Sequence, residues 1–316
     1  MPSSATLCFT DPDAWGQAVR NSNVELTPVG RGRFTGEIVA INLQRVWMQR
    51  MSDDLPRVIC ATNVPGRVII NFRAQPGPPL QTGGVDLLPH TILRYAEGQT
   101  IFQRSEGATV FCAMSLPVED LAAVAATLHG VDLKAPRDPA SIVPHPTALA
   151  RLHRLYAAAI DLAQHAPQVI ANAEAAHSME QELAHAMVDC LVPTEVTLWS
   201  VIGIRRSEVL KRFRSLLDAR LDEPMHLAEM CKALGVSERT LRACCQEALG
   251  VSPMRFLWLR RMNQARRALG RADPATATVT EIATAQGFWE LGRFAVQYRS
   301  LFGERPSETL ARARPD

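Results

Sequence analysis

The sequence contains no long uninterrupted apolar run, and this absence excludes one large class of proteins. No stretch approaches the roughly 18 consecutive apolar residues that a membrane-spanning helix requires. The N-terminus, from Met1 to Asp11, also lacks the basic segment and apolar run of a secretory leader. We therefore expect a cytoplasmic protein with no membrane partner, and its 316 residues suffice for two domains, each with its own core.

Cysteine and histidine are present without the spacing that disulfide or metal sites need. The seven cysteines are an odd number, form no C-x-x-C pair and show no zinc-finger spacing with histidine. Cys245 shares an apolar stripe with Leu241 and Leu249, so the adjacent pair Cys244 and Cys245 is interpreted as core packing rather than a redox sensor. We expect no cofactor and no metal.

Charge is distributed unevenly between the two parts of the chain. From Arg205 onward there are 20 Lys and Arg residues against 13 Asp and Glu residues, whereas the preceding residues hold 14 against 19. An excess of cationic residues in one domain is typical of a surface that neutralises phosphates, although solubility alone can produce a modest excess. The charge therefore directs attention to the last third of the chain.

That last third contains the same pattern twice. The first copy runs from Leu227 to Pro253 around Gly235, and the second runs from Val279 to Pro306 around Gly287. In each copy, apolar residues recur at steps of three and four on both sides of a glycine that can take a positive φ. The pattern predicts two helix-turn-helix units on one chain.

The outward residues of the two second helices are the candidate DNA contacts. The first of these helices is expected over 238–249 with Ser237 as its N-cap, and the second over 290–301. Arginine can donate two parallel hydrogen bonds to guanine or hold a phosphate, and the sequence leaves both roles open. The candidate DNA-binding residues are Glu238, Arg239, Thr240, Arg242, Gln246, Glu290, Leu291, Arg293, Val296 and Gln297.

A long helix expected over 254–269 connects the two units. It carries the pairs Arg260–Arg261 and Arg266–Arg267 beside an apolar stripe. We interpret most of these charges as a solvated face or as partners in salt bridges within the same module.

The first part of the chain favours strands and then helices. Short segments rich in β-branched residues lie between 25 and 115, and they predict a small barrel or sandwich. A pair of helices follows the proline-rich segment 135–146, and its stripe Leu149, Leu152 and Tyr156 is interpreted either as a dimer contact or as a cover for the barrel. We expect an N-terminal domain over 1–192, a linker over 193–206 with a hinge near Pro193, and a C-terminal domain over 207–316.

The duplicated module resembles the DNA-binding domain of the AraC/XylS transcriptional regulators. The resemblance covers about residues 207 to 310 and rests on anchors that include Leu234-Gly235, Gly250-x-Ser-Pro253, Gly287-Phe288 and Phe302-Gly303-x-x-Pro306. It implies an α+β chain, with a cupin-like N-terminal β-barrel and helical hairpin followed by an all-α domain with two helix-turn-helix subdomains. It also implies an activator that binds double-stranded DNA as a homodimer, contacts RNA polymerase and responds to a small-molecule effector.

The sequence departs from the family pattern within the second helix-turn-helix. Val296 stands where the family often has Arg or Lys, and Leu291 where it often has a polar residue, so direct base reading by this half is expected to be weak or differently arranged. Thr309 stands where the family has Tyr.

Two alternative functions remain open at this stage. A cupin-type enzyme fused to a DNA-binding module would need closely spaced histidines, and the early half of the N-terminal domain has only His90. An effector-independent structural DNA-binding protein would also carry the duplicated module, because no residue before 190 proves that a ligand binds.

Overall fold

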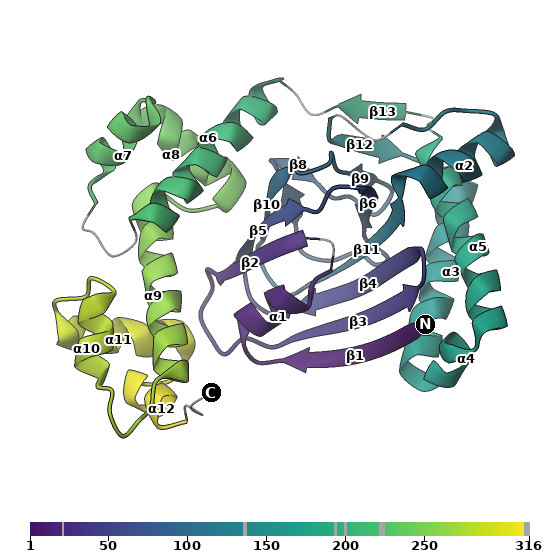
Figure 1. Cartoon of the computed structure of the whole chain (residues 1–316). Helices are drawn as coiled ribbons and strands as arrows, with labels where there is room; N and C mark the ends of the chain where they lie inside the picture. The colour runs from purple at the N-terminus through teal and green to yellow at the C-terminus, as the bar shows by residue number, and fades with distance from the viewer. Residues whose placement is uncertain (21, 135–137, 193–194, 199–200, 221–224, 313–316) are drawn as a thin grey trace.

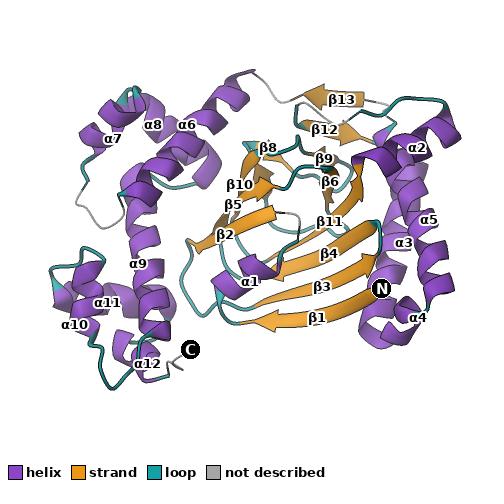
Figure 2. Cartoon of the chain, viewed as in Figure 1, coloured by secondary structure: helices purple, strands orange, loops and turns teal. Residues whose placement is uncertain are grey.

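The protein, described from a computed structural model, combines a β-rich N-terminal part with a helical C-terminal part (Figure 1). The structure describes residues 1–20, 22–134, 138–192, 195–198, 201–220 and 225–312. The expected α+β class is confirmed: most strands precede α2, and only helices follow β13 in the described residues (Figure 2).

The strands form two antiparallel sheets. Sheet A has the order β1 (Ser3–Phe9), β3 (Gly36–Leu43), β4 (Val46–Asp53), β11 (Thr109–Pro117), β6 (Arg67–Phe72), β9 (Ile92–Arg94), β12 (Ala140–Val143) and β13 (Glu195–Leu198). Sheet B has the order β2 (Ser22–Pro28), β5 (Arg57–Asn63), β10 (Thr100–Ser105), β7 (Leu80–Thr82) and β8 (Val85–Asp86). Among the described strands these are two separate hydrogen-bonded sheets, so the closed barrel that was expected is not observed.

The central strands of both sheets are buried on both faces because each sheet lies between two apolar layers. In sheet A, Ile38 faces the core between the sheets, whereas its neighbour Val39 faces the helices outside. In sheet B, Ile59 faces the same inner core, whereas Val58 faces the C-terminal helices. Because side chains alternate along a strand, two-sided burial requires the nearly continuous apolar runs found in the sequence.

Helices cover the outer face of sheet A. These are α2 (Val118–His129), α3 (Pro146–His165), α4 (Pro167–Ala171) and α5 (Ala173–Leu191), whereas α1 (Pro12–Ala18) lies beside β2. The stripe of α3 formed by Leu149, Leu152 and Tyr156 is at most 8% exposed and packs on this face. The interpretation of this stripe as a dimer contact is therefore wrong, because the monomer already buries these side chains and the hairpin covers its own sheet.

The C-terminal part consists of seven helices within the described residues. They are α6 (Val201–Ala219), α7 (Leu227–Leu234), α8 (Glu238–Leu249), α9 (Pro253–Arg271), α10 (Val279–Ala285), α11 (Leu291–Phe302) and α12 (Pro306–Ala311). The segment expected as a linker contains β13, which pairs with β12, and the start of α6. The expected hinge at Pro193 lies outside the described residues.

Two further features concern the whole described chain. None of its helices is both long enough and apolar enough to cross a membrane. All seven cysteines are free thiols, and all except Cys8 are buried, as the interpretation of Cys244 and Cys245 as core residues requires.

Candidate nucleic-acid interface

The first helix-turn-helix consists of α7 and α8. Gly235 ends α7 with φ of +65°, a left-handed conformation that lets the chain turn without a Cβ clash. Ser237 then caps α8, because its Oγ accepts a hydrogen bond from the Thr240 backbone N–H at 3.1 Å. The predicted bounds 238–249 and the predicted N-cap are therefore confirmed.

The two faces of α8 differ sharply in composition. Leu241, Cys245 and Leu249 are at most 1% exposed and pack with residues of α6, α7 and α9. The opposite face exposes all five candidate residues of this helix: Glu238, Arg239, Thr240, Arg242 and Gln246. A buried apolar stripe thus holds the helix while a polar face points to solvent.

The exposed residues of α8 are not equally available to a ligand. Thr240 Oγ1 lies 2.9 Å from Ser237 Oγ within the cap, and Arg242 forms a 3.4 Å ion pair with Glu238. Arg239 is exposed and takes part in no ion pair within the described part of the chain. Arg239 is therefore the guanidinium of this helix that can engage a ligand without breaking an existing contact.

The second helix-turn-helix consists of α10 and α11. Thr278 and Glu281 form a capping box at the start of α10, and Gly287 takes φ of +77° in the turn. Helix α11 begins at Leu291 and ends at Phe302, one residue later at each end than predicted, and Glu290 is its N-cap residue without a side-chain capping bond. Its buried face comprises Phe294, Tyr298, Leu301 and Phe302.

The exposed surface of α11 is more apolar than that of α8. Val296 is 70% exposed and Leu291 is 37% exposed, and Arg293 pairs with Glu290 at 3.5 Å. Gln297 is only half-exposed, since its Oε1 accepts a hydrogen bond from Trp258 Nε1 at 3.2 Å. Gln297, one of the five candidates in this half, would therefore have to give up this hydrogen bond to contact DNA through its Oε1.

One exposed residue beside α11 escaped the sequence analysis. Trp289 is 72% exposed and lies two residues before Leu291. With Met254, Arg261 and Phe288 it lines an open groove of about 390 Å³ between α9 and the second turn. The position of Trp289 directly before the predicted helix could have drawn attention to this residue, because a solvent-exposed tryptophan is unusual unless it contacts a partner.

The C-terminal anchor of the module is a buried polar cluster. Thr309 Oγ1 lies 2.8 Å from Tyr298 Oη and donates to Glu304 Oε1 at 2.8 Å. Arg266 and Arg312 both pair with Glu304, whose side chain is 3% exposed. Burial by itself would raise the pKa of Glu304, but the Thr309 hydroxyl and the two guanidinium groups hold it below its usual value. Thr309, which stands where the family has tyrosine, is therefore part of a buried hydrogen-bonded cluster that joins α12 to α11.

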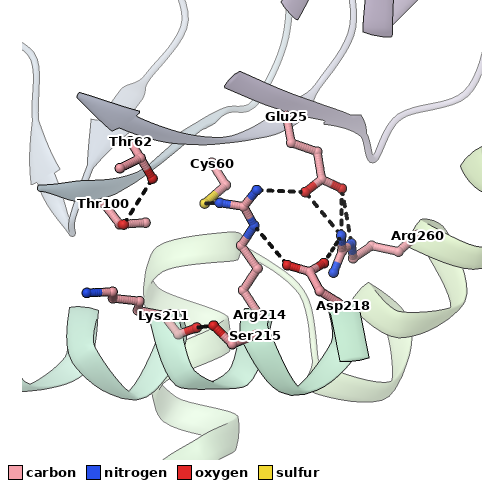
Figure 3. A network of polar contacts seen from close by, with 9 residues as sticks. All are labelled: Glu25, Cys60, Thr62, Thr100, Lys211, Arg214, Ser215, Asp218 and Arg260. Carbon is pink, nitrogen blue, oxygen red and sulfur yellow. Dashed lines mark hydrogen bonds and ion pairs between the residues drawn. The ribbon is translucent and has the colours of Figure 1, made fainter. Parts of the chain in front are cut away.

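The arginines of α9 correct another expectation. Arg260 is buried rather than solvated, and together with Arg214 of α6 it binds Glu25 of β2 across the junction between the two parts of the chain (Figure 3). Asp218 of α6 binds Arg260 at 2.6 Å and completes the network. Arg267 likewise pairs with Asp13 of the N-terminal part. Arg260 and Arg267 thus stabilise an interface between the two parts instead of forming a solvated face. Arg266 pairs with Glu304 and Arg260 pairs with Asp218, so salt bridges within the module, the other expected role, are confirmed for these two residues.

A buried thiol and apolar side chains extend this interface. Arg214 Nη1 donates to Cys60 Sγ at 2.9 Å, and burial raises the pKa of the Cys60 thiol to about 12. Val58 and Phe102 of sheet B belong to the same apolar cluster as Phe213 of α6 and Leu241 of α8. The five candidate residues of α8 remain exposed beside this contact, so the sheets position the helix without covering them.

Comparison with known proteins identifies a helix-turn-helix domain in the helical part of the chain. A family described as "Helix-turn-helix domain" matches residues 230–312. The "Probable thc operon regulatory protein" of Rhodococcus erythropolis is 47% identical over 94 residues, which are 30% of this chain and 28% of that protein. The "XylDLEGF operon transcriptional activator 2" of Pseudomonas putida is 31% identical over 101 residues, which are 32% of this chain and 64% of that protein.

A solved structure matches about a third of the chain. It is a probable AraC family transcriptional regulator from Rhodopseudomonas palustris, with 38% identity over 34% of this chain and 99% of that one, and a TM-score of 0.31. Of the two sequence relatives named above, the chain spans 28% and 64% of the length, which is less than two thirds in each case. Both sequence relatives carry the names of regulatory proteins. The chain belongs to the AraC/XylS family of helix-turn-helix, DNA-binding transcriptional regulators, which are not enzymes.

Proposed function

We propose that this protein recognises a specific double-stranded DNA site by placing α8 and α11 in successive major grooves. The observation that carries the proposal is the presence of two complete helix-turn-helix units, each with a buried apolar face and an exposed second helix, joined by α9. The 19 residues of α9 span roughly 28 Å at 1.5 Å per residue, which is close to one turn of DNA at about 34 Å.

The two helices differ in the contacts they offer to DNA. Arg239, Arg242 and Gln246 of α8 supply long hydrogen-bonding groups, whereas the exposed surface of α11 is largely Leu291 and Val296. Helix α8 therefore supplies most hydrogen-bonded base recognition, with Glu238 and Thr240 at its N-terminal end. Helix α11 contributes through Glu290, Arg293 and apolar contacts, and Gln297 contributes only if it leaves Trp258.

The N-terminal domain acts as the sensor, with its two facing sheets as an open counterpart of the cupin-like barrel. Support comes from the alternation of side chains along the strands of sheet B. Val24, Ala61 and Gln103 line a cavity between the sheets. Their immediate neighbours Glu25, Cys60 and Phe102 contact the C-terminal helices. A small-molecule effector in the cavity would thus lie one residue away from the contacts that position α6, α8 and α9.

We further propose that domains 1–192 and 207–316 act together as a cytoplasmic homodimer that contacts RNA polymerase. Both partners are implied by the family resemblance, and the relatives from Pseudomonas putida are named as activators. An effector-independent structural DNA-binding protein is the alternative. The packing of the cavity wall against the DNA-binding helices favours the sensor.

Substitution of the α8 arginines tests the proposal. On the preferred duplex, Arg239→Ala should cost about 1–3 kcal/mol of binding free energy and relax the preference at one or two base pairs if the guanidinium contacts guanine. A phosphate contact would instead weaken binding to every sequence and lower the salt slope by about one unit. Arg154→Ala removes an exposed arginine from α3 and serves as the control. The proposal fails if Arg239→Ala and Arg242→Ala both match the control in affinity, specificity and salt dependence.

A further inference from the structure

A small cavity lies between the two sheets, and both sheets supply its walls. Ile69 and Phe111 come from sheet A, Ile59 and Ile101 come from sheet B, and Trp15 of α1 lies beside them. Its volume is about 50 Å³. Since one water-sized group needs about 10–15 Å³, the cavity has room for roughly three to five non-hydrogen atoms.

Three buried carboxamides face this cavity. Asn63, Asn71 and Gln103 all line it and are 4%, 7% and 2% exposed. One atom of each side chain is held by a hydroxyl. Ser22 Oγ donates to Asn63 Oδ1 at 2.9 Å, Asn71 Nδ2 donates to Tyr95 Oη at 3.2 Å, and Gln103 Nε2 donates to Thr82 Oγ1 at 3.4 Å. These bonds hold one end of each amide group, and a hydroxyl can hold either the oxygen or the nitrogen because it both donates and accepts.

The second polar atom of each carboxamide has no hydrogen-bond partner within the described part of the chain. These atoms are Asn63 Nδ2, which is a donor, and Asn71 Oδ1 and Gln103 Oε1, which are acceptors. A buried polar group without a partner is destabilising, so three such groups at one cavity are costly unless a ligand satisfies them. A neutral ligand group that carries both hydrogen-bond donors and acceptors can satisfy the free ends of these amides.

The lining disfavours a charged ligand. Arg20 is the one charged residue among the lining side chains, and it is exposed, with its guanidinium 5.8 Å from the Trp47 ring. The remaining lining residues are apolar or neutral, and burying an unpaired carboxylate or ammonium among them would carry a large desolvation cost. A neutral group with both donor and acceptor atoms avoids this cost.

We propose that this cavity binds a small uncharged molecule whose polar end resembles a primary amide, with an apolar remainder of one or two carbon atoms. The amide oxygen accepts from Asn63, the amide N–H groups donate to Asn71 and Gln103, and the alkyl end contacts Ile59, Ile69 and Phe111. The proposal rests on the proposed sensor function, because it assigns the chemical class of the effector.

Acetamide and propionamide are the probes, and acetate and propionate are their charged counterparts of similar shape. In thermal unfolding of the full-length protein, both amides should raise Tm with saturable dependence on concentration, and neither carboxylate should do so. Gln103→Met and Asn71→Leu remove the free acceptors at similar side-chain volume and should weaken amide binding at least tenfold. Asn42→Leu is the matched control, because the Oδ1 of Asn42 also lacks a partner but this residue does not line the cavity.

The outcomes separate the ligand class from the regulatory role. Equal stabilisation of wild type and Gln103→Met by the amides, or equal binding of amides and carboxylates, would overturn the ligand class. Absence of any amide effect on Tm would overturn it as well, even if the protein binds its DNA site. A third outcome is that Gln103→Met loses amide binding, while the amides leave the DNA affinity of the wild-type protein unchanged. This outcome would support the ligand class and contradict the sensor function.

Discussion

Glu25 of β2 and Arg260 of α9, which are 235 residues apart in sequence, form a bidentate ion pair across the junction between the sheets and the DNA-binding helices. Arg260 Nη2 lies 2.8 Å from Glu25 Oε1 and 3.1 Å from Oε2, and the arginine side chain is 6% exposed. A buried guanidinium needs its counter-charges, so this pair ties the position of α9 to that of β2.

Removal of the carboxylate should loosen the junction. We expect Glu25→Ala to lower the free energy of unfolding in urea by about 2–3 kcal/mol, which is less than loss of a fully buried pair because Asp218 still contacts Arg260. Glu37→Ala breaks a half-exposed pair with Arg50 and should change stability by less than about 1 kcal/mol. Equal effects of the two substitutions would contradict the role given to Glu25.

The Cys60 thiol reports on the same junction. Burial raises its pKa to about 12, so at neutral pH it should react with alkylating reagents far more slowly than the exposed Cys8. In a Cys8→Ser background, Glu25→Ala should accelerate modification of Cys60, as followed by mass spectrometry of peptides. Cys112, which lies in sheet A away from the junction and has a pKa also raised to about 12 by burial, should keep its rate. Parallel acceleration of both thiols would indicate global unfolding instead.

Acid should weaken the second subdomain through Glu304. The pKa of this carboxyl lies below its ordinary 4.5 in the folded protein, so its ionised contacts add stability above that pH, and this stability is lost as the pH falls through the lower folded value. We expect Glu304→Gln to be less stable than wild type at pH 7, with the difference shrinking below about pH 4.5. Urea unfolding of both proteins between pH 3 and pH 7 measures this, and a constant difference would contradict the assignment.

The apolar surface of α11 should recognise thymine methyl groups. Leu291 and Val296 are exposed and cannot form base-specific hydrogen bonds through their side chains, whereas apolar contact with the C5-methyl of thymine is available in the major groove. Replacing thymine by deoxyuridine in the half-site of α11 removes only the C5-methyl group and should therefore reduce the affinity for DNA. Substitution with 5-methylcytosine, which keeps this methyl group on a different base, is the control for the methyl group alone. The same replacement in the half-site of α8 should have a smaller effect. An affinity that is indifferent to deoxyuridine in the α11 half-site would refute this mode of recognition.

The sequence predicted local features far better than contacts between distant segments. The bounds of α8 and its Ser237 cap followed from apolar periodicity and a glycine turn, which are encoded within about fifteen residues. The pairing of β1 with β3 and of β12 with β9 joins segments that no local pattern connects. The role of Glu25 was invisible for the same reason.

The stripe on α3 illustrates a different limit. Periodicity showed that Leu149, Leu152 and Tyr156 share an apolar face, but it did not show whether that face meets another chain or the sheet of the same chain. The three carboxamides of the cavity were also missed, because Asn and Gln within strands become informative only when the fold places them around one cavity with unpaired atoms.

Selection of bound duplexes from a randomised library is the most direct test of the claim that α8 and α11 each recognise a DNA sequence. We expect a bipartite motif whose two elements are centred about 10–10.5 base pairs apart, one turn of B-DNA. Arg239→Ala should relax the element recognised by α8 and leave the other unchanged, and Val296→Ala should do the reverse. A single short element, or no enrichment of any sequence at physiological salt, would contradict the account.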